Sequence, residues 1–234
     1  MKKDRLIALD VFRGFTIALM IIVNSPGNWD NTFSPLLHAD WDGITLTDFV
    51  FPFFIFIVGV SVVLSQQKKG TSSSIQSIIL RSIKIFSLGV FLGFFTEFMY
   101  HVIGEGESFS FSDIRIPGVL QRIAIVYLFC AVLYNYSNWI QQLIIMLTIL
   151  VLYYVSMQFI PVPGIGPGVL EPGKNLAAYI DSLLIPGSMW EGTWDPEGIL
   201  STFPAIASGI GGMLAGHILF TKKSKENKVI LMYF

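Results

Sequence analysis

A short polar stretch, LLHADWDGITLTD at residues 36–48, separates two long apolar runs. It contains His38, whose imidazole can act as a nucleophile towards an acyl thioester or as a general base for an amine or hydroxyl. Asp48 is a carboxylate that can hold this imidazole in one tautomer. Asn24, at the end of the preceding apolar run, supplies an amide that can donate to a developing oxyanion. Together these residue types favour acyl transfer. Each also has a simpler explanation: His38 as a surface histidine, Asp48 as a carboxylate that interacts with a helix dipole, and Asn24 as a polar residue at a helix end.

Charged residues also interrupt the first apolar run. Asp10, Arg13 and Asn24 follow one another, by way of Ile17 and Met20, at helical three- and four-residue steps, so they share one helix face. A charge within a membrane span costs about 2.5 to 3.5 kcal/mol on insertion scales and is therefore a candidate for function. The pattern predicts a polar track beside a cavity. The alternative is that Asp10 and Arg13 neutralise each other or extend to the membrane surface.

Another apolar run begins IRIPGVLQRIAIVY and places Gln121 and Arg122 about one helical turn inside it. Arg122 either extends to lipid phosphates or reaches into a cavity to meet an anionic substrate. Two further helix starts are expected. Thr45 or Thr47 is the predicted cap of the second run, and Asp195, followed by Pro196, is the predicted N-cap of the last long run.

These residues must be positioned by membrane-spanning helices. Of the 234 residues, 53% are hydrophobic and 13% are charged, and the mean hydropathy is +0.65, whereas globular domains carry about 25% charged residues. The fold class predicted is therefore an all-α, polytopic membrane helix bundle within the lipid bilayer. Cys130 is the one cysteine, so no intramolecular disulfide is possible, and no metal-binding spacing or nucleic-acid-binding patch occurs. Six spans are expected, at about 7–24, 45–65, 76–98, 117–135, 139–160 and 199–220.

The distribution of lysine and arginine predicts the orientation, because cytoplasmic loops are rich in both. The positive segments are the N-terminus, the connection after the second span and the connection after the sixth. The loop 25–43 has no lysine or arginine, and the long connection 161–198 has only Lys174. We therefore expect a cytoplasmic N-terminus and an outward-facing His38. A seventh span is expected to begin at Lys228, so we interpret residues 1–234 as one transmembrane acyltransferase domain that is cut short at its C-terminus.

Five segments in order carry a resemblance to a known family: RLIALDVFRG, MIIVN, HADWDGITLTDFVFPFFIFIVGVS, RIPGVLQRIAIVY and DPEGIL. Over Arg5 to about Leu219 the sequence resembles the transmembrane acetyltransferases related to heparan-alpha-glucosaminide N-acetyltransferase. The resemblance implies that cytosolic acetyl-CoA supplies an acetyl group to a sugar amine on the far side of the membrane. The family motif HAxWxGxTxxDxVFP puts the catalytic histidine on His38, and the family's asparagine falls on Asn24.

The resemblance also implies a mechanism. Acetyl-CoA would lie along the polar face of the first span, with Asn24 at the thioester and Asp48 orienting His38. Either His38 is acetylated first, or it deprotonates an amine that attacks directly. The candidate substrate-binding residues are Asp10, Arg13, Trp41, Gln121 and Arg122, and no metal is expected.

The partners expected are acetyl-CoA, an outward-facing amino sugar or glycan, the lipid bilayer and a second copy of the chain in a homodimer. The chain lacks the long N-terminal luminal region of the animal enzymes, which suggests a bacterial inner-membrane relative. The competing interpretations are a transporter or channel with an intramembrane polar path, and a structural membrane subunit whose polar residues pack helices.

Overall fold

The computed structural model describes residues 7–69, 73–104, 114–190, 192–221 and 224–233. Within these ranges the regular elements are helices, and the β-type pairing consists of two isolated bridges, Arg115 with Gly187 and Val162 with Gly166. The predicted all-α class is confirmed. In the described part of the chain, six helices are long and apolar enough to cross a membrane: α1 (Ile7–Asn24), α2 (Val50–Lys69), α3 (Ile75–Ile103), α4 (Val119–Tyr136), α5 (Trp139–Phe159) and α7 (Ile199–Phe220).

The structure contains two shorter helices besides the six spans, and two of the spans begin or end at other residues than predicted. The amphipathic α6 (Leu176–Leu184) lies in the connection between α5 and α7, and α8 (Lys225–Tyr233) begins before Lys228, where a seventh span was expected. The third span continues to Ile103, beyond the predicted end near residue 98, because it ends only at Gly104, whose left-handed backbone (φ 79°) stops the helix. The second helix starts later than predicted, after a 3-10 turn at Thr47–Phe49.

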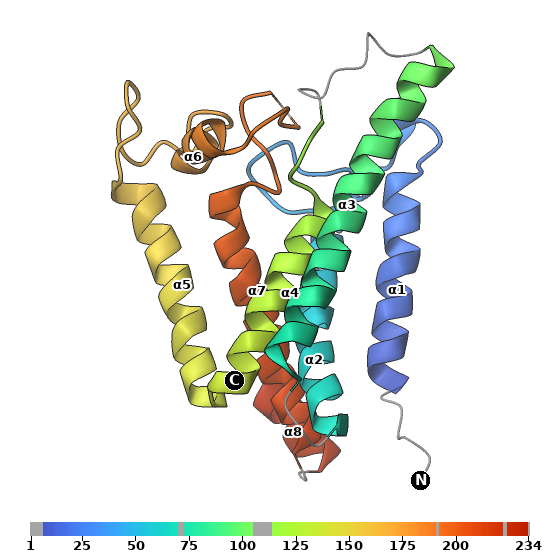
Figure 1. Ribbon diagram of the computed structural model, residues 1–234, viewed down its shortest axis with the longest axis vertical. Coiled ribbons are helices and arrows are strands. Elements are labelled where there is room, and N and C mark those ends of the chain that lie inside the picture. The colour runs from blue at the N-terminus through green and yellow to red at the C-terminus, as the bar shows by residue number, and fades with distance from the viewer. Residues whose placement is uncertain (1–6, 70–72, 105–113, 191, 222–223, 234) are drawn as a thin grey trace.

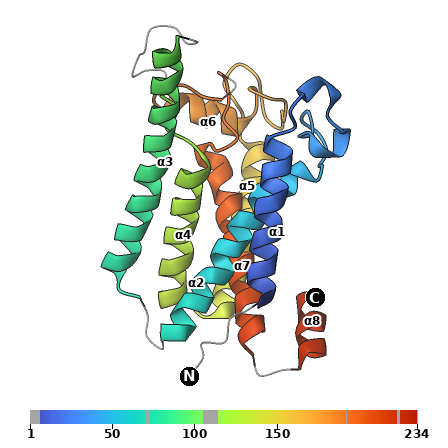
Figure 2. The ribbon, with the colours of Figure 1, turned by 90° about the vertical axis from the view of Figure 1, so that its right-hand side faces the viewer.

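The long helices run side by side and leave polar segments at two ends of the bundle. Figures 1 and 2 show the loop 25–49 and α6 at one end, together with the C-terminal end of α1 and the start of α7. The start of α1, the end of α2, the start of α3 and α8 lie at the opposite end. Functional side chains on loops and helix ends are therefore divided between two separate regions.

The centre of the bundle depends on a close approach between α2 and α7. A Cβ atom added at Gly59 would overlap the carbonyl of Gly209, and one added at Gly212 would overlap the backbone of Phe56. Small residues let helix backbones come this close, which increases van der Waals contact where there is no hydrophobic effect between spans. Fully buried side chains from α2, α4 and α7 surround the contact, among them Val63, Val126, Ile210 and Met213.

We expect Gly212→Ala to destabilise the bundle by about 1 to 3 kcal/mol, the usual penalty for forcing extra atoms into a packed core. The matched control is Gly211→Ala, since a Cβ there meets only Met146 Sδ at 3.8 Å. Thermal unfolding in detergent measures both. A Gly212→Ala protein that unfolds at the same temperature as Gly211→Ala would contradict this account of the α2–α7 contact.

Candidate active site

His38 and Asp48 form a close pair at the loop end of the bundle. His38 Nδ1 lies 2.6 Å from Asp48 Oδ1, and the His38 side chain is 71% exposed. In the neutral imidazole an Nδ1–H donated to the carboxylate leaves the lone pair on Nε2. The predicted pairing of these two residues is therefore present in the geometry. The nitrogen that can react, Nε2, belongs to a side chain that is largely exposed.

The Asp48 carboxylate is itself fixed by the loop. Its Oδ2 accepts hydrogen bonds from the backbone N–H of Thr45 (2.8 Å) and of Ala39 (3.3 Å), and Thr45 Oγ1 lies 3.0 Å away. The prediction that Thr45 or Thr47 caps the second helix is wrong. The 3-10 turn follows Leu46 without a side-chain cap, and Thr45 Oγ1 instead donates to the Leu37 carbonyl at 2.6 Å. The sequence folds this segment around Asp48.

Trp41 connects the His38 loop to the other half of the bundle. Its indole Nε1–H donates to the Leu170 carbonyl (2.9 Å), and its ring packs edge to face on Trp194, with 5.1 Å between centroids. Beside this contact lies a cavity of about 490 Å³, which we name the Trp41 cavity. Its lining includes Trp41, Asp42, Tyr153, Asp181, Trp194 and Ser201. A ligand-sized space therefore adjoins the loop that holds His38.

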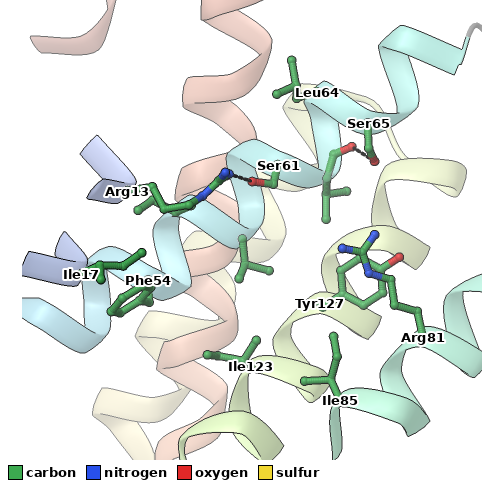
Figure 3. Close-up of a pocket in the computed structure, with 13 residues that line it drawn as sticks. Arg13, Ile17, Phe54, Ser61, Leu64, Ser65, Arg81, Ile85, Ile123 and Tyr127 are labelled. Atoms are coloured by element: carbon green, nitrogen blue, oxygen red, sulfur yellow. Dashed lines mark hydrogen bonds between the residues drawn. The ribbon is translucent and has the colours of Figure 1, made fainter. Parts of the chain in front are cut away.

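A second cavity, of about 590 Å³, lies among α1, α2, α3 and α4 (Figure 3). We name it the Arg13 cavity. Arg13 extends into it from α1, with Nη2 3.3 Å from Ser61 Oγ and Nη1 3.5 Å from Asp10. Arg81 extends from α3, and its guanidinium lies 4.9 Å from the Tyr127 ring centroid. Asp10 partly neutralises Arg13, but the described lining residues include both arginines and no Asp or Glu, so the lining is positively charged and suits an anion.

Asn24 lies at the end of α1 that faces the His38 loop. Its exposed side chain donates from Nδ2 to the Met20 carbonyl at 2.9 Å. In the described part of the chain no hydrogen bond joins Asn24 to His38. An amide nitrogen carries two N–H donors, so one stays available. Asn24 and His38 therefore lie at the same end of the bundle, and a role of Asn24 in catalysis stays a prediction.

Gln121 and Arg122 are buried at the start of α4. Gln121 Nε2 donates to the Ile116 carbonyl at 2.8 Å. Arg122 Nη2 donates to Ser201 Oγ at 2.5 Å and to the Gly198 carbonyl at 3.2 Å, and its Nε has no hydrogen-bond partner among the described residues. With 8% exposure, Arg122 does not extend to the lipid surface. It joins α4 to the start of α7, and a contact with substrate stays a prediction.

An ion-pair cluster that the sequence did not predict lies above these two helices. Arg115 donates to both oxygens of Asp195 (2.6 and 2.7 Å), contacts Glu197, and stacks 5.1 Å from the Trp190 ring centroid. Burial raises the pKa of Asp195, but the hydrogen bonds and charge of Arg115, together with the backbone N–H groups of Glu197 and Trp190, outweigh it and hold this pKa below its usual value. Arg115 and its partners are distant in sequence, so no local pattern could reveal the cluster.

The start of α7 also differs from the prediction. Asp195 is not the N-cap, because the helix begins at Ile199 after Gly198, which has no capping side chain. Asp181 of α6 supplies the cap instead, and its Oδ1 accepts the Ile199 N–H at 2.8 Å. Its carboxylate lies so close to Gly198 that an added Cβ there would overlap it. Burial raises the pKa of Asp181.

The fold and these sites define a multi-pass membrane protein with a histidine–carboxylate pair at one end and an arginine-lined cavity towards the other. Residues 5–232 match the family described as heparan-alpha-glucosaminide N-acetyltransferase, catalytic, and the chain belongs to that family. The resemblance predicted from the sequence motifs is thereby confirmed.

Two curated relatives agree with this assignment. The chain is 32% identical to heparan-alpha-glucosaminide N-acetyltransferase of Mus musculus, over 99% of this chain and 41% of the relative. It is 31% identical to the protein of the same name of Homo sapiens, over 98% of this chain and 41% of the relative. The chain thus spans about two fifths of the length of these relatives.

We expect Asp195→Asn to destabilise the protein by about 1 to 3 kcal/mol at neutral pH, because Arg115 loses its two charged hydrogen bonds to Asp195 and keeps only Glu197 as a carboxylate partner. Since the pKa of Asp195 is lowered by folding, from a normal value of 3.8, its contribution to stability is complete above that value. It is lost as the pH falls through the lower pKa of the folded state. Wild-type protein should therefore lose stability on acidification more steeply than Asp195→Asn.

The measurement is thermal unfolding in detergent between about pH 6 and pH 2, a range that includes the loss expected below the normal pKa. Glu171→Gln is the control, since Glu171 forms an exposed pair with Lys174 (2.6 Å, both side chains at least 60% exposed) and should change little. Equal pH profiles for wild type and Asp195→Asn would refute this role for the cluster.

Proposed function

We propose that this chain is a membrane acetyltransferase that moves an acetyl group from acetyl-CoA to an amino sugar on the opposite side of the membrane. The observation that carries the proposal is the His38–Asp48 pair, which leaves an accessible imidazole Nε2 at one end of a bundle whose other half contains a cationic cavity. Membership of an acetyltransferase family supports the acyl chemistry.

The Arg13 cavity is the proposed site for the nucleotide end of acetyl-CoA. Guanidinium groups bind phosphates through charge-assisted hydrogen bonds, and Arg13 and Arg81 approach this cavity from two different helices. Arg81 was not among the residues predicted from the sequence. From Arg13 to Asn24 the axial rise of α1 is about 16 Å, a distance that the extended pantetheine arm of CoA has to cover to bring the thioester to the His38 loop.

At the loop end, the proposed chemistry uses three groups. Asp48 holds the Nδ1–H of His38, so Nε2 keeps its lone pair. This lone pair either attacks the thioester carbonyl or accepts a proton from the attacking amine. Asn24 has one N–H free to stabilise the oxyanion, provided that its side chain rotates towards the thioester. Nε2 of His38 is therefore the proposed reactive atom whether His38 is acetylated first or deprotonates the amine.

The proposed sidedness rests on charge. The connections at the end that includes Arg13 and Arg81 are rich in lysine and arginine, whereas the loop 25–43 has none. By the positive-inside rule the Arg13 cavity faces the cytoplasm, where acetyl-CoA is made available, and His38 faces outward. The donor and the acceptor would therefore react without either molecule being transported across the membrane.

We expect His38→Ala to lower kcat/KM for acetyl transfer from acetyl-CoA to glucosamine by about 10²- to 10⁴-fold, the usual contribution of a positioned acid–base group. Asp48→Asn should give a smaller loss, since it keeps the imidazole but weakens its orientation. His101→Ala, at the end of α3, is the histidine control. Radiolabelled transfer in membranes measures all three, and undiminished transfer by His38→Ala would exclude the proposal.

The nucleotide site has a separate test that uses a shortened donor. Arg81→Gln should raise the KM for acetyl-CoA by about 10- to 100-fold, as expected for the loss of a charged hydrogen bond. It should leave acetyl-pantetheine, which lacks the nucleotide, nearly unaffected. Lys84→Gln, on the same helix but not among the lining residues, is the matched control. An equal effect of Arg81→Gln on both donors would contradict phosphate binding at this cavity.

A further inference from the structure

A third cavity, of about 300 Å³, lies among α3, α4, α7 and the end of α6. We name it the Arg122 cavity. It shares no lining residue with the Arg13 cavity or the Trp41 cavity. The lining is apolar or glycine except for four side chains, which are Gln121, Arg122, Glu197 and Thr202. A space of this size and composition suits a ligand that is mostly hydrocarbon and has one polar group.

The opening of this cavity is formed by side chains at membrane depth. Phe129 of α4 and Phe203 of α7 line the cavity and are nevertheless exposed, and both helices are long and apolar enough to span a membrane. Leu184, at the end of α6, is an exposed lining residue as well. Because the hydrocarbon layer contains no water, a ligand that enters between these side chains comes from the bilayer.

Arg122 brings unused hydrogen-bond donors to this lining. Its Nη2 donates to Ser201 Oγ and to the Gly198 carbonyl, whereas Nε and Nη1 have no partner among the residues that the structure describes. The residue is 8% exposed, so bulk water is a poor substitute for a partner. A buried, charged donor without an acceptor is costly. The cavity therefore favours a ligand that supplies an acceptor to the guanidinium.

The charges around Arg122 indicate that this acceptor is uncharged. Arg115 is paired with Asp195 and Glu197, and Glu197 also lines the cavity. Asp181, whose carboxylate accepts the first N–H of α7, adds a further acidic group at this end of the bundle. Two guanidiniums thus face three carboxyl groups, and no excess positive charge is left for a phosphate or a fatty-acid carboxylate. An ester carbonyl accepts a hydrogen bond without adding charge.

We propose that the Arg122 cavity binds one acyl chain of a bilayer phospholipid, with the chain against Phe129 and Phe203 and the ester carbonyl accepting a hydrogen bond from the Arg122 guanidinium. The rise of α4 from Gly118 to Phe129 is about 16 Å, close to half of the hydrocarbon core of about 30 Å. The cavity thus has the depth of one leaflet. Lipid bound in this way links α3 and α4 to α7, and it does so independently of the proposed acetyl transfer.

The test compares lipids that differ only at the ester. The full chain in detergent is stripped of lipid and titrated with a diacyl phosphatidylcholine or with its dialkyl ether analogue, and bound lipid is measured by native mass spectrometry. The ester lipid should bind about tenfold more tightly, as expected for a hydrogen bond to a charged group. Arg122→Met should remove this preference. Methyl oleate should bind more tightly than oleate, whose carboxylate meets Glu197.

A second variant tests the cavity without changing Arg122. Ile125→Phe enlarges a lining side chain of α4 and should weaken the binding of both phosphatidylcholines at least about tenfold, because the added atoms occupy the space of the acyl chain. Ile144→Phe is the matched control, since Ile144 is exposed on α5 and lies outside this lining. It should bind both lipids as wild type does. Thermal unfolding without lipid checks that each variant is folded.

Each outcome supports or overturns the site. Equal affinity of wild type for the ester and ether lipids would overturn the contact with Arg122, and tighter binding of oleate than of methyl oleate would overturn the choice of an uncharged acceptor. Lipid binding that Ile125→Phe leaves unchanged would place the lipid elsewhere on the bundle, and no bound lipid at all would leave the proposal without support. If Arg122→Met does not fold, the wild-type comparison and Ile125→Phe still decide.

Discussion

The structure depends on one constraint: within the hydrocarbon layer every backbone N–H and C=O must find a partner inside the protein. Long helices satisfy it, and the absence of a hydrophobic effect between them leaves close packing as the main source of cohesion. Glycines on α2 and α7 supply that packing at Gly59 and Gly212. Irregular backbone, with its freedom to place reactive side chains, is consequently gathered in the loops at the ends of the bundle.

At the end of the bundle that carries the His38 loop, side chains instead of a helix supply partners for backbone N–H groups. The Asp48 carboxylate satisfies two backbone N–H groups and faces one hydroxyl while it holds the His38 ring. Its structural and chemical roles are inseparable, because the interactions that fold the loop also fix the carboxylate that orients the imidazole. Arg115 has a comparable structural role on the other side of this end, where it ties the approach to α4 to the approach to α7.

Most of the fold could be predicted from the sequence, since apolar length alone locates membrane spans. The His38–Asp48 pair was also within reach, because both residues lie in one short loop. Arg115 with Asp195, and Asp181 with Ile199, were not, since their pairing depends on how distant segments meet. In the sequence Arg81 has no neighbours that mark it as functional, and only the packing of α3 against α4 places it beside a cavity. Local patterns report helices, whereas the cap of α7, the ion pairs and the cavities arise from tertiary packing.

In the proposed reaction the charged part of the donor stays towards one end of the bundle, and the bond that is made forms at the other. The phosphates of CoA would stay with Arg13 and Arg81, while the amine of the acceptor reacts at the His38 loop and becomes an uncharged amide. The phosphates therefore remain near an interface, where the cost of leaving water is lowest. The part that passes from one side to the other is the acetyl group, which is small and uncharged. A bundle of this kind needs no wide hydrated channel, because it has only to align a thioester with an amine at the His38 loop.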